Sequence, residues 1–282
     1  MTTSVIVFLW KTIHLDNLRS HTTNSVAMSK NFDIVPQSLT SKLLLSFTLI
    51  LSLILTNTAI AEYIPPKNPS SPKTATGSNG TRTNECTGNG KTTLTALAPL
   101  NHVGQTASLQ PTFAWFVPNS QSREIEFSLY QYENGEPKLL YTKQMQSSPG
   151  IMQLSLIKEN TSLSVGQQYL WQVALLCNPN HGSEDLIVKA EIEVVEIPPS
   201  LKNLISQKKE LIKRSELYAE NGLWYDALAE SPNRASTLRL LSELRKIELE
   251  EINKIPESDR KKYLQQQILQ LQEVVDVEQL PK

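Results

Sequence analysis

A period-two alternation of apolar and polar residues runs through residues 92–197 and limits what this chain can fold into. In "VKAEIEVVE", which begins at Val188, apolar residues fill every second position and lysine or glutamate lies between most of them. The runs "EIEFSLY" (124–130) and "YLWQVALLC" (169–177) alternate in the same way. Neighbouring residues of a strand point to opposite faces, so these runs predict antiparallel sheets with one buried face and one wet face. About seven such runs, separated by turn signals such as Asn134-Gly135, predict an immunoglobulin-like β-sandwich.

The pattern changes to a helical period after Pro198-Pro199. We therefore expect a segregated α+β fold, in which the antiparallel β-sandwich (91–198) is followed by an α-helical hairpin region (199–282). The block "YAENGLWYDAL" (218–228) resembles the corner of a tetratricopeptide hairpin, with glycine ending one helix, aromatics opening the next and Ala227 at the close approach. No second copy of this pattern follows, so a single hairpin is predicted.

A leader sequence is predicted before the sandwich. Residues 41–62, "SKLLLSFTLILSLILTNTAIAE", combine a lysine, an apolar run and a small-x-small motif, which predicts cleavage between Ala61 and Glu62. The apolar run is shorter than the roughly 20 residues that a membrane span needs. Met28 fits as the start, so 28–61 is the predicted signal peptide and 1–27 a mis-assigned upstream extension. An uncleaved anchor and a genuine extended leader are the alternatives. We expect a periplasmic or extracellular protein without a membrane attachment after cleavage.

Residues 62–90 are rich in Pro, Ser, Thr and Asn and poor in apolar residues, which predicts a flexible tether. The chain has two cysteines, Cys86 and Cys177, and both follow the leader. In an oxidising compartment an isolated pair predicts a disulfide, which would fasten the tether to the sandwich. Two unpaired thiols are the alternative.

The sequence speaks against several classes of function. A formal net charge of −1 provides no field that would attract nucleic acid. The stretch "GNGKTT" (88–93) lacks the first glycine of a P-loop, because that position holds Glu85. His102 and His181, the histidines that follow the leader, lack zinc-ligand spacing, and "CNPNHGSED" reads as a turn rather than a hydrolase or calcium site. We expect no cofactor, no metal and no catalytic residues.

The blocks "LTALAP", "PTFAWFVP", "VGQQYLWQVALLCNP" and "YAENGLWYDAL" resemble a family of exported proteins, known mainly from cyanobacteria, that is classed as a domain of unknown function. The resemblance runs from about Cys86 to Leu228. Trp115, Cys177 and residues 218–228 match positions typical of the family, and the chain departs from it after Ala229. The family implies no catalytic residues.

These observations predict a non-enzymatic, exported protein-interaction or envelope-scaffolding module with a protein partner. The interaction candidates are Trp224, Tyr225 and whichever of Trp115 and Phe116 faces outward. The first two also fit a plain helix–helix core. The alternative functions are glycan or small-ligand binding through aromatic faces of the sandwich, and a hydrolase built around His102 or His181.

Overall fold

The computed structural model describes residues 62–78, 92–118, 121–177 and 185–280. They belong to one compact unit, Ala59–Lys282. The predicted upstream extension (1–27), the signal peptide with Ala61, Cys86 and His181 lie outside the described residues. Within the described ranges, no helix is both long enough and apolar enough to cross a membrane.

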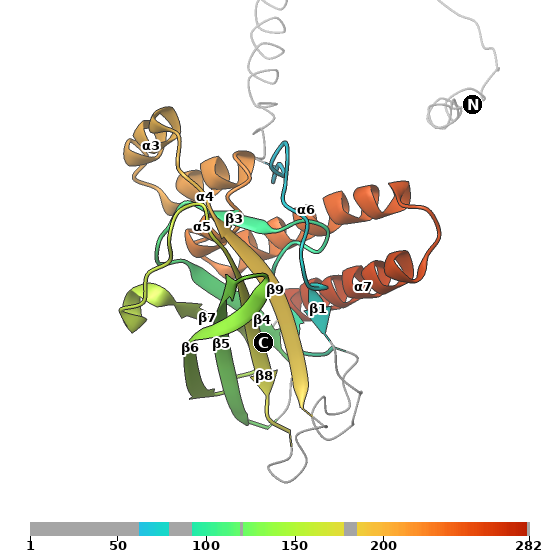
Figure 1. Ribbon diagram of the computed structural model, residues 1–282. Coiled ribbons are helices and arrows are strands. Elements are labelled where there is room, and N and C mark those ends of the chain that lie inside the picture. Colours follow the sequence, from blue (N-terminus) through green and yellow to red (C-terminus); the bar gives the residue numbers. More distant parts are fainter. Residues whose placement is uncertain (1–61, 79–91, 119–120, 178–184, 281–282) are drawn as a thin grey trace, which may run out of the picture. The chain divides into compact units, whose positions relative to one another are not determined.

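The larger of two sheets has six strands in the order β1–β9–β8–β5–β6, with β3 also paired to β9 (Figure 1). Its strands are β1 (Gly77–Ser78), β3 (Gly104–Thr106), β5 (Glu124–Glu133), β6 (Glu136–Gln146), β8 (Gln168–Leu175) and β9 (Leu186–Val194). All pairs are antiparallel except β3–β9, which is parallel. The prediction of a purely antiparallel sandwich is therefore wrong at this pair. Parallel strands need a long connection between them, so no local turn signal marks such a pair.

The smaller sheet is antiparallel, with β4 between β2 and β7. Its strands are β2 (Thr95–Ala96), β4 (Thr112–Val117) and β7 (Gly150–Ser155). The chain leaves the larger sheet after β6 and enters the smaller one at β7, and a short 3₁₀ helix, η1 (Leu156–Glu159), follows. Two sheets linked in this way are sandwich-like, as the alternation predicts.

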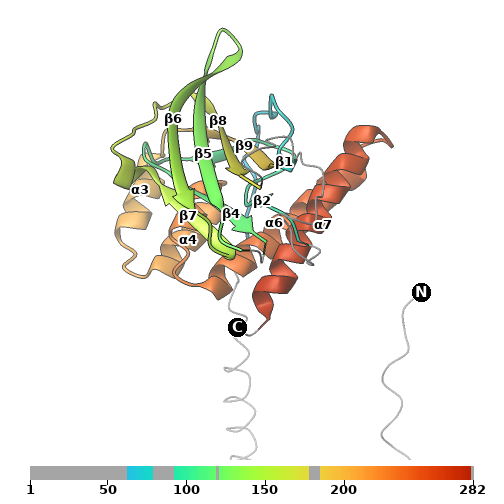
Figure 2. The same cartoon turned by 90° about the horizontal axis from the view of Figure 1, so that it is seen from below.

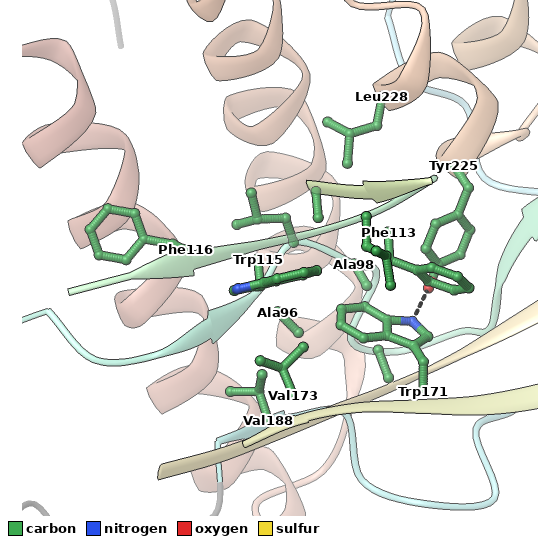
Figure 3. Packing of buried hydrophobic residues seen from close by; sticks show 14 of the residues in the cluster. Ala96, Ala98, Phe113, Trp115, Phe116, Trp171, Val173, Val188, Tyr225 and Leu228 are labelled. Carbon is green, nitrogen blue, oxygen red and sulfur yellow. Dashed lines mark hydrogen bonds between the residues drawn. The ribbon is translucent and has the colours of Figure 1, made fainter. Parts of the chain in front are cut away.

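Aromatic side chains fill the space between the two sheets (Figure 3). The ring centroids of Phe113 on β4 and Trp171 on β8 lie 5.5 Å apart, and those of Trp115 and Phe127 lie 6.1 Å apart. Each of these rings is fully buried. Aromatic pairs at such separations add to the burial of apolar surface, so this layer holds the sheets together.

Five helices are described after the sheets. They are α3 (Pro199–Ser206), α4 (Leu211–Glu220), α5 (Trp224–Ala229), α6 (Arg234–Lys254) and α7 (Asp259–Gln279). Asn233 and Ser236 form a capping box that begins α6. Helices α4 and α5 meet where Ser215 Oγ donates to the Ala227 carbonyl at 2.7 Å.

The helices share their core with the sheets. Helix α5 contacts β3 and β4, and α7 contacts β2, while α6 and α7 form an antiparallel pair (Figures 1 and 2). One continuous cluster of buried residues joins the strands to Leu228, Leu241 and Val274. The sandwich and the helical region are therefore parts of one folding unit.

Residues 62–78, called the strap below, are not a tether. Tyr63 is fully buried, Ser70 accepts a backbone hydrogen bond from Val103 at 2.9 Å, and Gly77–Ser78 form β1 against β9. The predicted flexible tether is wrong for this part, and its remainder up to residue 90 lies outside the described residues. The composition predicted a flexible segment because the segment is almost free of apolar residues. One buried aromatic and a series of polar hydrogen bonds nevertheless hold it against the rest of the protein.

The strap also covers part of the sheet face that was expected to be wet. Glu191 on β9 is only 2% exposed. Its carboxylate accepts hydrogen bonds from the Thr74 backbone N–H at 2.7 Å, from Thr74 Oγ1 at 2.9 Å and from Tyr132 at 2.8 Å. The alternation marked Glu191 correctly as pointing away from the core, but water is replaced there by the strap.

Candidate functional site

The block 218–228 forms the corner between α4 and α5. Gly222 adopts a positive φ of +76°, which favours glycine and allows the tight turn. A Cβ at this glycine would lie 3.0 Å from Pro66 Cγ, so the strap packs directly on the turn. The Ile64 N–H donates to the Ala219 carbonyl at 3.0 Å. The corner is therefore the docking surface for the strap.

Trp224 and Tyr225 are buried and connect this corner to the sheets. Trp224 Nε1 donates to the Leu97 carbonyl at 2.9 Å. The Tyr225 hydroxyl accepts a hydrogen bond from Trp171 Nε1 at 2.8 Å (Figure 3). It also donates to the Glu191 carbonyl at 3.0 Å. Both aromatics thus serve the core, and neither can anchor a partner from outside.

Trp115 and Phe116 are also buried, so neither faces outward as an interaction site would require. Their side chains point to opposite faces of β4, as strand geometry demands. One face meets the larger sheet, and the other belongs to the core shared with the helices. Because all four candidates are buried, the prediction that Trp224, Tyr225 and one of Trp115 and Phe116 contact a partner is wrong. A β-sandwich alone would expose one of the adjacent pair, but the helical layer covers it.

Asp226 extends the same network. Its Oδ2 accepts from the Ala107 N–H at 2.8 Å, next to β3. Burial raises the pKa of Asp226 to about 6, and the hydrogen bond from Ala107 partly opposes this rise. The carboxylate satisfies a backbone donor at the end of β3, which makes it a structural fastener.

Tyr63, His102 and Glu248 form a second buried polar group, here called the buried triad. The Tyr63 hydroxyl lies 2.9 Å from His102 Nε2, and His102 Nδ1 lies 3.7 Å from Glu248 Oε1. The carboxylate accepts from the N–H groups of Leu100 at 2.8 Å and Asn101 at 3.1 Å. Their exposed fractions are 0% for Tyr63, 7% for His102 and 1% for the Glu248 side chain.

Burial sets the protonation of the triad. It lowers the pKa of His102 to about 4 and raises the pKa of Glu248 to about 7, although two backbone N–H groups favour the carboxylate. The pKa of Tyr63 also rises well above its usual value, first through burial and then through Glu248. At neutral pH, His102 and Tyr63 are therefore uncharged.

The order hydroxyl–imidazole–carboxylate is that of a nucleophile–base relay. Nucleophilic chemistry also needs a substrate beside the hydroxyl, and Tyr63 has no exposed surface in this state. In the described part of the chain, no group of three or more His, Cys, Asp or Glu residues could hold a metal ion. In this geometry the buried triad has a structural role, because it joins the strap to the 99–103 loop and to α6.

Sequence reasoning missed Tyr63, Glu191 and Glu248. A usable signal existed for Glu248, because it lies on the same helical stripe as Leu241, Leu244 and Ile252. A carboxylate within an apolar stripe indicates a buried, partnered acid. No sequence signal distinguishes Tyr63 or Glu191 from exposed residues. Cys177 is buried two residues after the end of β8, while its predicted partner Cys86 lies outside the described residues.

The described unit is thus a sandwich-like pair of sheets with C-terminal helices packed on it. The chain belongs to the family described as Domain of Unknown Function (DUF928), whose model matches residues 77–248. This range covers more than half of the chain and includes the corner, both sheets and Glu248, while most of the strap and α7 lie outside it.

Comparison with solved structures found similarity to the fn3 domain of the human collagen alpha-1(XX) chain. The two share 13% sequence identity over 38% of this chain and 81% of that domain, with a TM-score of 0.22. Comparison with curated proteins gave no match.

Proposed function

We propose that the chain is an exported, non-enzymatic protein-interaction module of periplasmic or extracellular location, with a scaffolding role in the envelope. The observation that carries the proposal is the burial of the polar clusters that most resemble a catalytic arrangement. Tyr63, His102, Glu191, Asp226 and Glu248 are all buried and hydrogen-bonded within the unit. We therefore place the proposed function on the outer surface of the unit, which is free to bind another protein.

The surface that best suits a protein partner is the outer edge of β6. This strand ends the larger sheet and pairs only with β5 among the described strands. Near the hairpin, Pro137 and an irregularity in the pairing with Leu129 and Tyr130 interrupt the strand. The stretch Tyr141–Gln146 is regular, and its side chains alternate between half-buried and exposed. Half of its backbone N–H and C=O groups point away from β5 and are available to another strand.

The partner that fits this edge is an extended segment of another protein, added as a further strand. Tyr141 and Lys143 hold the inner side of the edge in place, because both donate to the Glu159 carboxylate on η1. The pKa of Glu159 is lowered, chiefly by the hydrogen bonds from Lys143 and Tyr141. Thr142, Gln144 and Gln146 are exposed and polar, so specificity would come from hydrogen bonds beside the new strand.

A photo-crosslinking residue at Gln144 tests this proposal in cells that produce the full chain. The control carries the same residue at Leu269, which is 63% exposed on α7. We expect one crosslinked protein from position 144, lost when excess unlabelled mature protein competes, and none from position 269. Equal products from both positions, or none from position 144 in a folded and exported protein, would refute the β6 edge as the contact.

A hydrolase is the second candidate, and the 2.9 Å contact between Tyr63 and His102 favours it. Substrate access would require the strap to leave. A His102→Gln variant that keeps its fold and loses ester hydrolysis would support the enzyme. Glycan binding through tryptophan faces is disfavoured, because Trp115, Trp171 and Trp224 are fully buried. The proposal includes an immunoglobulin-like strand topology, which the two facing sheets support. It also includes the occurrence of this family mainly in cyanobacteria, which the sequence blocks support.

A further inference from the structure

The strap is anchored within one residue of the predicted cleavage site. Glu62 is exposed, whereas the next residue, Tyr63, is fully buried. The Tyr63 ring packs edge-on against Trp224 with centroids 5.1 Å apart, and its hydroxyl contacts His102. The position of Glu62 is therefore fixed by the body of the protein.

A carboxylate on α6 lies beside this end of the strap. The Tyr63 N–H donates to Glu243 Oε2 at 3.1 Å. One residue of chain spans at most ~3.6 Å, so the backbone nitrogen of Glu62 lies within about 7 Å of that oxygen. The other Glu243 oxygen accepts from Arg239 Nε at 3.2 Å, and Lys246 Nζ pairs with the Glu62 carboxylate at 3.0 Å.

We propose that Glu243 binds the α-ammonium group that Glu62 acquires when the leader is removed. This inference rests on the proposed export with cleavage after Ala61. Water, activated by a leader peptidase, adds to the Ala61 carbonyl, and the C–N bond to Glu62 breaks. Ala61 leaves with a carboxylate, and the nitrogen of Glu62 takes up protons and becomes a cation. Before cleavage the same nitrogen is a neutral amide, so the site forms only in the mature chain.

The same geometry sets the order of events. A peptidase holds several residues on each side of the cleaved bond in an extended form. Tyr63, the second residue after that bond, cannot meet this requirement while its ring is buried against Trp224. Cleavage therefore precedes insertion of Tyr63, and the new cation is available when the strap docks.

A double-mutant cycle tests the site. The chain from Glu62 to Lys282 comprises nearly all of the compact unit Ala59–Lys282, so it is a suitable protein. It is prepared with a free amino terminus, released from a cleavable fusion, and with an N-acetylated terminus, each in the wild-type and Glu243→Gln backgrounds. Glutamine keeps an acceptor for the Tyr63 N–H, and the cycle cancels the loss of the Arg239 pair.

We expect acetylation to lower the Tm of the wild-type chain by about 2–4 °C and to leave that of Glu243→Gln unchanged. Lys246→Gln is the matched control, and it should keep the full effect of acetylation. Equal Tm values for the free and acetylated wild-type chains, or an equal drop in Glu243→Gln, would overturn the assignment.

Amino-terminal sequencing of the protein recovered from the envelope separates this inference from the proposed export. A first residue of Glu62 supports both. Another first residue in an exported protein overturns the Glu243 site and leaves export standing. A full-length chain retained inside the cell overturns export, while the cycle still reports whether Glu243 can bind the amine.

Discussion

Removal of the Tyr225 hydroxyl should destabilise the protein strongly, although the substitution deletes one atom. In Tyr225→Phe the ring keeps its place in the core, but Trp171 Nε1 loses the acceptor 2.8 Å away and the Glu191 carbonyl loses a donor at 3.0 Å. Both groups are buried. Each unsatisfied buried group costs about 1–3 kcal/mol, so the loss of both partners should lower the free energy of unfolding by about 2–6 kcal/mol.

Urea denaturation monitored by tryptophan fluorescence and circular dichroism measures this change. The midpoint should fall with an unchanged slope, and the Tm should drop by roughly 4–24 °C. Tyr130→Phe, at a half-buried position on β5, is the matched control and should change stability by no more than about 0.5 kcal/mol. A loss below about 0.5 kcal/mol in Tyr225→Phe would refute the view that this hydroxyl joins α5 to the larger sheet.

Three further predictions concern other parts of the unit. Burial raises the pKa of Glu248 to about 7, so the folded state binds this proton more tightly than the unfolded state. The contribution of Glu248 to the free energy of unfolding is therefore largest below about pH 4.5 and falls by up to about 3 kcal/mol as the pH rises to 7. Glu248→Gln should make the free energy of unfolding, measured by urea denaturation, depend less on pH over this range. An unchanged pH dependence would contradict the prediction. Gly104→Ala would place a Cβ 2.7 Å from Tyr225 Cε2 and should cost about 1–3 kcal/mol by thermal denaturation; wild-type stability would show that β3 can shift. Thiol titration of the protein purified without reductant tests the predicted disulfide and should detect no free thiol. A Cys177→Ser variant should release one reactive thiol at Cys86 and lose no more than about 4–5 kcal/mol of stability. Two titratable thiols in the native chain would exclude the predicted disulfide.

The strands could be predicted because their signal is local. Alternation in β9 marks Val188, Ala190 and Ile192 as core residues, and all three are buried. The helical period after Pro199 likewise predicts helices, of which α6 is one. The Asn233–Ser236 capping box lies where α6 begins. Such patterns depend on neighbours in sequence, which a reader of the chain can see.

The rest depended on contacts that no local pattern encodes. Phe116 is buried because helices far along the chain cover its side of β4, and Glu191 is buried because the strap crosses it. The same holds for Tyr63, whose polar surroundings in sequence predict exposure. The prediction of interaction residues was wrong for one reason. The aromatic residues that were expected to bind a partner are buried where the sheets pack against each other and against the helices.

The strap also has a kinetic consequence. Its first anchor, Tyr63, binds Glu243, which lies 180 residues later in the chain. Closing so long a loop is slow, and the contact cannot form until α6 has been synthesised. A nascent chain therefore carries Tyr63 unburied through most of its synthesis, exposed to chaperones and proteases. Completion of α6 would end that vulnerable period, which makes α6 the segment whose truncation should send the protein to degradation.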